Sequence, residues 1–142
     1  MSSGHAPNPI EAGNTRHTTP DGSSGLRTQR GDDASDAIIV LTTVPDLLLA
    51  KRIAHILVEE YLVACVNLGA PGLSMYMWQG TLEGTEELTL TIKTTVACLP
   101  ALYTRLCSLH PYEVPEFLVL SAQAGSVAYL DWVAAQTALR AD

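Results

Sequence analysis

Apolar and polar residues alternate along two neighbouring stretches in the middle of the chain. The apolar residues at every second position are Leu73, Met75, Met77, Leu88, Leu90 and Ile92. The positions between them carry Ser74, Tyr76, Trp78, Glu87, Thr89, Thr91 and Lys93. A period of two predicts β-strands, and Gln79-Gly80 supplies a turn that accepts positive φ. We therefore predict a long β-hairpin, with Gly84 marking a bulge or a longer loop.

The predicted hairpin is long for so small a domain. Its first strand, from Ala64 to Trp78, would span roughly 50 Å at about 3.3 Å per residue. A compact domain of this size has a diameter of roughly 33 Å. The hairpin should therefore overhang its own domain, and a lone hairpin is only marginally stable in water. We infer that other copies of the chain cover it.

The segments on either side of the hairpin complete the predicted fold. Residues 37–41 are continuously apolar, which suits a buried strand, and Pro45 precedes a helix. The apolar stripe of that helix is Ala50, Ile53, Ala54, Leu57 and Tyr61. Leucines between Leu99 and Leu109 predict a second helix. Pro100 would kink this helix unless the helix begins late.

Two further elements close the chain. Residues 117–120 are apolar throughout and predict a fourth strand, and Ser126 is placed to cap a last helix. The predicted order is β-α-β-β-α-β plus a C-terminal helix. This order indicates an α+β, ferredoxin-like (split β-α-β) sandwich with a long hairpin between its second and third strands. Because the helices would cover only one face of the sheet, an oligomer is expected to cover the other.

The first 36 residues differ in composition from the rest. They are rich in proline, glycine, serine and threonine, and Ile10 and Leu26 are their only large aliphatic residues. Such a segment buries too little apolar surface to offset the entropy of ordering it. We predict a disordered tail at residues 1–36 and a folded domain at residues 37–142.

Charge and cysteine content narrow the function classes. The net charge of −7 argues against nucleic acid and anionic membranes as partners. The chain has no apolar run long enough to span a bilayer and no apolar signal region at its start. Its three cysteines, Cys65, Cys98 and Cys107, form no C-x-x-C motif, which favours a reducing, cytoplasmic location.

Several short motifs resemble the CutA1 divalent-cation tolerance proteins, over about residues 37–132. The matching pieces are Ala64-Cys65-Val66-Asn67, residues 74–80 (SMYMWQG), Glu87, Lys93-Thr94-Thr95, residues 110–116 (HPYEVPE) and Tyr129-Leu130-Asp131-Trp132. This resemblance implies a ferredoxin-like homotrimer in which long hairpins pair edge to edge. It also implies tolerance of copper (Cu2+) or other divalent cations, with no metal required for folding. Pro100 and Ser121-Ala122 depart from the family pattern.

The candidate metal ligands are Cys65, His110, Glu113 and Glu116. Cys65 is either a small buried thiol or a soft ligand for Cu(I). His110 is either an imidazole stabilised by the helix C-terminus or a nitrogen ligand. His110 with Glu113 or Glu116 would suit Cu(II) or Zn(II). Because no compact ligand motif is present, we expect a surface or intersubunit site.

A second set of residues suggests a cleft between subunits. It comprises Tyr76, Trp78, Glu87, Lys93, Tyr112 and Glu116. One interpretation is an interface network in which a neighbour buries the rings and Glu87 pairs with Lys93. The other is a polar cleft that binds a small anion or a metal complex.

Three function hypotheses follow from these observations. The first is a trimeric metal-responsive binding protein of the CutA1 kind. The alternative is a trimeric small-molecule sensor that resembles the PII signalling proteins and binds its ligand in the intersubunit cleft. The third is a scaffold without a ligand. No nucleophile elbow, P-loop or dinucleotide motif is present, so we do not expect an enzyme.

Overall fold

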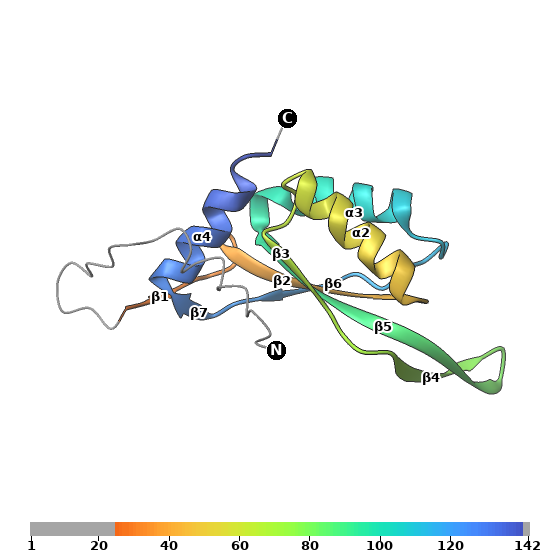
Figure 1. The fold of residues 1–142 in the computed structure, drawn as a ribbon. Coiled ribbons are helices and arrows are strands. Elements are labelled where there is room, and N and C mark those ends of the chain that lie inside the picture. The colour runs from red at the N-terminus through yellow and green to blue at the C-terminus, as the bar shows by residue number, and fades with distance from the viewer. Residues whose placement is uncertain (1–24, 141–142) are drawn as a thin grey trace, which may run out of the picture.

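An antiparallel sheet with helices packed on one side makes up most of the chain (Figure 1). The computed structural model describes residues 25–140. Four strands lie side by side in the order β3-β5-β2-β6. Their bounds are Ala37–Val44 for β2, Cys65–Leu68 for β3, Thr81–Thr95 for β5 and Leu118–Ser121 for β6. Strand β4 (Gly72–Trp78) pairs with the other end of β5.

Three α-helices and a second, small sheet complete the described part. The helices are α2 (Leu47–Glu59), α3 (Leu99–Leu109) and α4 (Val127–Thr137), and a 3-10 turn η1 (Val96–Cys98) leads into α3. Strand β1 (Leu26–Thr28) pairs antiparallel with β7 (Ala124–Ser126). The structure therefore confirms the predicted α+β class and the C-terminal helix.

The core lies between the sheet and helices α2 and α3. Alternate residues of β2 and β5 point toward these helices and are almost fully buried. The largest core side chains are Ile38, Val40, Val44, Ile53, Leu57, Leu88, Leu90, Ile92, Leu102 and Leu106. The predicted helix stripe is confirmed at Ala50, Ile53 and Leu57. Tyr61 lies beyond the end of α2, in a left-handed conformation with φ 56°.

Pro100 lies in the first turn of α3 and does not interrupt it. A backbone N–H has no intrahelical partner at that position, so proline sacrifices no hydrogen bond there. The expected kink is wrong, and the late helix start that we gave as the alternative is what occurs, because η1 takes up residues 96–98. Ser126 caps α4 as predicted, since its Oγ accepts a 3.2 Å hydrogen bond from the Tyr129 N–H.

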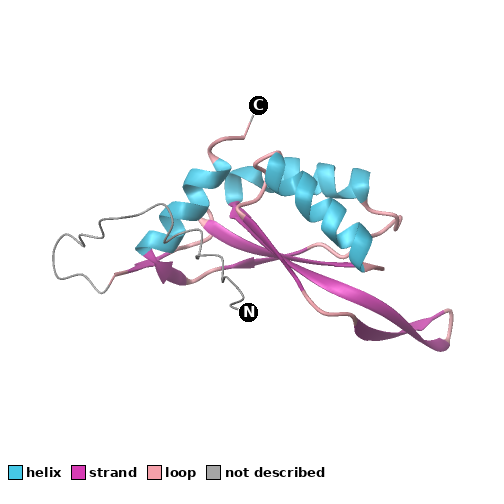
Figure 2. Cartoon of the chain, viewed as in Figure 1, coloured by secondary structure: helices cyan, strands magenta, loops and turns pink. Residues whose placement is uncertain are grey.

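The structure confirms the hairpin, but its long continuous strand is the second strand, β5, and not the first. The predicted strand from Ala64 to Trp78 is divided into β3 and β4 by residues 69–71, which include Pro71. Strand β5 runs unbroken for 15 residues and pairs with both. Gln79 and Gly80 form the turn with φ of 49° and 81°. Gly84 lies in regular register opposite Met75, so the predicted bulge is wrong. Figure 2 shows the β4-β5 hairpin projecting beyond the helices.

Part of the segment that was predicted to be disordered has defined structure. Residues 1–24 lie outside the described residues, whereas residues 25–36 have defined structure and include β1. The Gln29 side chain donates to the carbonyls of Ala37 and Ala122 at 3.1 and 2.8 Å and accepts from the Ala37 N–H at 2.8 Å. Amino-acid composition did not predict this ordered segment, because hydrogen bonds with the distant strands β7 and β2 stabilise it.

Replacing Gln29 with alanine should destabilise the protein by about 1–3 kcal/mol, because three hydrogen bonds to backbone groups are lost. The free energy of unfolding in urea would measure this change. Gln29→Glu should be nearly as damaging, since a carboxylate cannot donate to the two carbonyls. Replacing the exposed neighbour Arg30 with alanine is the control, and an equal effect there would contradict the assigned role of Gln29.

Candidate functional site

The face of the sheet opposite α2 and α3 is the first candidate surface, and we call it the open face. Strand pairing places Cys65 of β3 opposite Lys93 of β5, Lys93 opposite Ile39 of β2, and Ile39 opposite Leu120 of β6. Residues paired in this way point to one face. Asn67, Thr91, Leu41 and Leu118 form the next row. Leu118 and Leu120 are 57% and 46% exposed, so apolar side chains meet solvent here.

Cys65 lies in the first of these rows and is only half-buried. It therefore differs from Cys98, which is 1% exposed and belongs to the interior. Lys93 lies beside Cys65, and its side chain makes no hydrogen bond or ion pair within the described residues. A thiol and an ammonium group thus share the open face, both accessible to a ligand or to another copy of the chain.

His110 ends α3 and is 7% exposed. Its Nε2 lies 2.7 Å from the Thr43 carbonyl oxygen, and its Nδ1 accepts a 3.1 Å hydrogen bond from the Tyr112 N–H. A carbonyl only accepts and a backbone N–H only donates, so the ring is neutral with its proton on Nε2. His110 thereby ties β2 to the segment after α3, and a metal could bind only if one of these two hydrogen bonds broke.

The structure does not bring the four candidate metal ligands together. Cys65 lies in the same row of the sheet as Ile39 of β2, whereas His110 contacts the carbonyl of Thr43. Thr43 is four residues further along β2, which is about 13 Å. Cys65 and His110 therefore cannot ligate one ion within a chain. Glu113 and Glu116 are exposed on the segment after His110. Within residues 25–140, no group of three or more histidine, cysteine or acidic side chains is placed to hold a metal.

Part of the predicted cleft is assembled within a single chain. The Tyr112 hydroxyl donates to Glu87 Oε2 at 3.5 Å, and the Tyr76 hydroxyl lies 2.7 Å from Thr85 Oγ1. The Tyr112 ring also packs against His110 with 4.8 Å between ring centroids. These contacts join the hairpin to the segment after α3. We call Tyr76, Thr85, Glu87 and Tyr112 the tyrosine cluster.

The remaining cleft residues lie elsewhere. Trp78 is at the hairpin turn, opposite Thr81. Lys93 and Glu87 share a face of β5, but six residues separate them by about 20 Å. The predicted Glu87–Lys93 pair is therefore wrong within one chain. Glu87 contacts Tyr112, Tyr76 contacts Thr85 and His110 contacts the Thr43 carbonyl instead. Spacing along the sequence could not reveal these partners, because the contacts depend on strand register and on the path of the chain after α3.

The pKa of Tyr112 is raised, first by burial and then by the negative charge of Glu87. The folded state therefore retains the phenol proton to a higher pH than the unfolded state, whose tyrosines titrate near about 10. Stability that is present below this pH is lost as the pH rises through the folded value. We expect Tyr112→Phe to lose less stability in alkali than the unaltered protein. Unfolding in urea at neutral and alkaline pH tests this, and equal losses would contradict it.

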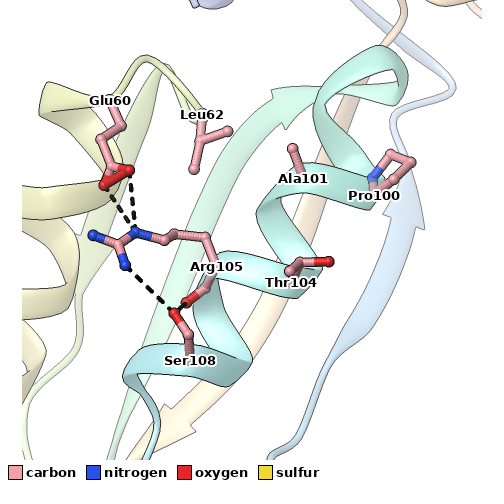
Figure 3. Close-up of a pocket in the computed structure, with 7 residues that line it drawn as sticks. All are labelled: Glu60, Leu62, Pro100, Ala101, Thr104, Arg105 and Ser108. Atoms are coloured by element: carbon pink, nitrogen blue, oxygen red, sulfur yellow. Dashed lines mark hydrogen bonds and ion pairs between the residues drawn. The ribbon is translucent and has the colours of Figure 1, made fainter. Parts of the chain in front are cut away.

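A hollow between α2 and α3 has a volume of 530 Å3 but lies apart from these residues. Its lining is Glu60, Leu62, Pro100, Ala101, Thr104, Arg105 and Ser108 (Figure 3). Arg105 Nε donates to Glu60 Oε1 and Oε2 at 3.1 and 2.9 Å, so the two charges in the hollow neutralise each other. None of the predicted site residues lines it. We therefore assign it no ligand.

Fold and surface together define a small α+β protein with a projecting hairpin, an open face of mixed apolar and polar residues, and no assembled metal site in the described residues. The chain belongs to the CutA1 divalent ion tolerance protein family, whose model matches residues 38–136. No helix of the described residues has the length and apolarity to cross a membrane.

Individual relatives agree with this assignment. The divalent-cation tolerance protein CutA of Thermus thermophilus is 48% identical over 100 residues, which are 70% of this chain and 96% of that protein. The structure of CutA from Synechococcus elongatus aligns with a TM-score of 0.73 and 40% identity, covering 80% of this chain and 96% of that one. CutA from Xylella fastidiosa aligns with a TM-score of 0.70 and 40% identity, covering 72% and 98%.

Proposed function

We propose that this protein is a metal-responsive binding protein that acts as a ferredoxin-like homotrimer and binds copper or another divalent cation. The observation that carries the proposal is membership of a family whose proteins are named for divalent ion tolerance. We also propose that it works in the cytoplasm, since its three cysteines are free thiols and a reducing compartment keeps them so.

The exposed apolar surface supports the homotrimer. Half-exposed leucines of β6 and the large side chains of the hairpin would all remain in water in a single chain. Fully burying one such side chain contributes about 1.5–3 kcal/mol. The outer edges of β4 and β6 are also unpaired within the described chain. Unpaired edges readily accept a strand of another copy.

The dispersed positions of the ligands favour a metal site that needs more than one chain. Glu113 and Glu116 offer oxygen ligands on an exposed segment, while Cys65 lies on the open face. Cu(II) accepts nitrogen and oxygen donors, and Cu(I) prefers sulfur. Copies that meet through the open face could place Cys65 of one beside carboxylates of another.

Calorimetric titration of Cu(II) into the full chain tests the proposal. We expect saturable heat that is reduced in Glu113→Gln, Glu116→Gln and Cys65→Ser. Glu59→Gln is the matched control, because Glu59 is an exposed carboxylate on α2, paired with His55. No saturable heat, or an equal reduction in the control, would contradict a copper site at these residues. His110→Ala can be compared with these variants only if its folding is measured as well, because the substitution removes two structural hydrogen bonds.

The relatives described above give no support to the PII-like alternative, and we do not propose it. The tyrosine cluster itself contains hydroxyls and one carboxylate, and Lys93 lies about 20 Å away along β5. An anion would therefore meet the Glu87 charge, which no ion pair within the described residues neutralises.

A further inference from the structure

A groove lies between the start of α2 and the segment that follows α3. It has a volume of 340 Å3, and its lining is Pro45, Asp46, Leu48, Leu49, Arg52 and Pro111. Leu48 is 80% exposed, and its neighbour Leu47 is 46% exposed. A surface helix normally carries polar residues at its solvated positions. The start of α2 therefore presents apolar surface to solvent beside a concave site.

Hydrogen bonds hold both walls of the groove in place. Asp46 caps α2, since its carboxylate accepts a 2.8 Å hydrogen bond from the Leu49 N–H. His110 Nε2 donates to the Thr43 carbonyl at 2.7 Å, which keeps Pro111 beside the start of α2. A groove whose walls are already ordered loses little conformational entropy when a partner binds. The groove is therefore preorganised for binding.

The charged groups of the lining favour a carboxylate as ligand. The Arg52 guanidinium makes no hydrogen bond or ion pair within the described residues. Asp46 is the one acidic residue of the lining, and its carboxylate is engaged in the helix cap. The next acidic residue along α2 is Glu59, about 10 Å beyond Arg52 along the helix axis. A guanidinium binds a carboxylate through two parallel N–H donors.

We propose that this groove binds a short acidic segment of another protein, in which an apolar side chain the size of leucine stands next to a carboxylate. The apolar side chain packs between Leu48 and Pro111, and the carboxylate accepts from Arg52. The volume is at the low end of the range for ligand pockets, which suits one side chain rather than a large molecule.

Neither the net charge nor the proposed trimer conflicts with this partner. The chain carries a net charge of −7, but charges more than about 8 Å apart are largely screened at physiological ionic strength. A short segment therefore responds mainly to Arg52. Helix α2 lies on the side of the sheet opposite the open face (Figure 1). A trimer built through the open face leaves the groove accessible, and the groove acts independently of the proposed metal site.

NMR of the full chain, labelled with nitrogen-15, tests the proposal. The probe is a synthetic peptide with blocked ends, in which one leucine followed by two glutamates is flanked by glycine and serine. We expect saturable shifts of the backbone amides around the groove, at residues 46–52 and at Tyr112. Two matched peptides replace the glutamates with glutamine or the leucine with alanine. Each should bind about fivefold more weakly, because one loses the charge pair and the other the apolar contact.

Charge exchange shows whether Arg52 recognises the carboxylate. Arg52→Glu should weaken binding of the acidic peptide by about tenfold, because an attractive pair becomes a repulsive one. A peptide with lysine in place of glutamate should then bind Arg52→Glu more tightly than it binds the unaltered protein. Lys51→Glu is the matched control, since Lys51 is an exposed cation of the same helix that does not line the groove.

Three outcomes would overturn the proposal. The acidic peptide could cause no saturable shifts, Lys51→Glu could weaken its binding as much as Arg52→Glu does, or the charge exchange could fail to restore binding. Arg52 and Lys51 are both exposed, so both variants should keep the fold, which their amide spectra verify directly.

Discussion

Replacing Leu120 with aspartate is expected to separate the proposed homotrimer into single chains. Leu120 lies on the open face, opposite Ile39, and remains 46% exposed in one chain. In an assembly that covers this face, the aspartate would be buried without a partner, which strongly disfavours association. The folded chain itself should tolerate the change, because the side chain at this position already meets solvent.

Light scattering at micromolar concentration measures the outcome. The unaltered protein should have three times the 15.2 kDa mass of one chain, and Leu120→Asp should have one. Leu48→Asp is a matched control, since Leu48 is 80% exposed on α2, away from the open face. A single-chain mass for the unaltered protein would contradict the trimer. A three-chain mass for Leu120→Asp would show that the interface lies elsewhere.

Replacing His110 with alanine is expected to destabilise the protein by about 2–4 kcal/mol. The substitution removes the hydrogen bonds to the Thr43 carbonyl and the Tyr112 N–H. It also leaves a space where the ring contacted Tyr112. His110→Gln should fall between alanine and the unaltered protein, because its amide can still donate to the carbonyl.

Unfolding in urea at a fixed protein concentration measures the loss, since the stability of an oligomer depends on concentration. Amide hydrogen exchange adds a local test, because the Tyr112 N–H should exchange faster once its acceptor is absent. His55→Ala is the control, since His55 is exposed and pairs only with Glu59 on the surface of α2. An equal loss of stability in both variants would contradict the role assigned to His110.

Local patterns predicted the elements of this fold well. The apolar stripe of α2 places Ala50, Ile53 and Leu57 in the core, and the turn at Gln79-Gly80 joins two strands. Ser126 caps α4. Each of these features depends on residues within a few positions of one another, so it can be read from spacing and side-chain chemistry.

Apart from the local features at Gly84 and Pro100, the errors concern contacts between distant segments. Residues 25–36 seemed disordered by composition, yet Gln29 bonds to Ala37 and Ala122. One interpretation paired Glu87 with Lys93 in an interface network, yet within one chain Glu87 accepts from Tyr112. Parity along a strand tells which residues share a face, but it does not tell which distant segment meets that face.

For the candidate site, the sequence determined which chemical groups are present: the thiol of Cys65, the imidazole of His110, the carboxylates after it and the alternating hairpin. It also determined the family, through motifs that a family model matches at residues 38–136. Only the tertiary structure decided that Cys65 and His110 lie too far apart to share an ion, and that both nitrogens of His110 are engaged. The reason is physical: ligand geometry depends on strand register and chain path, which long-range packing sets.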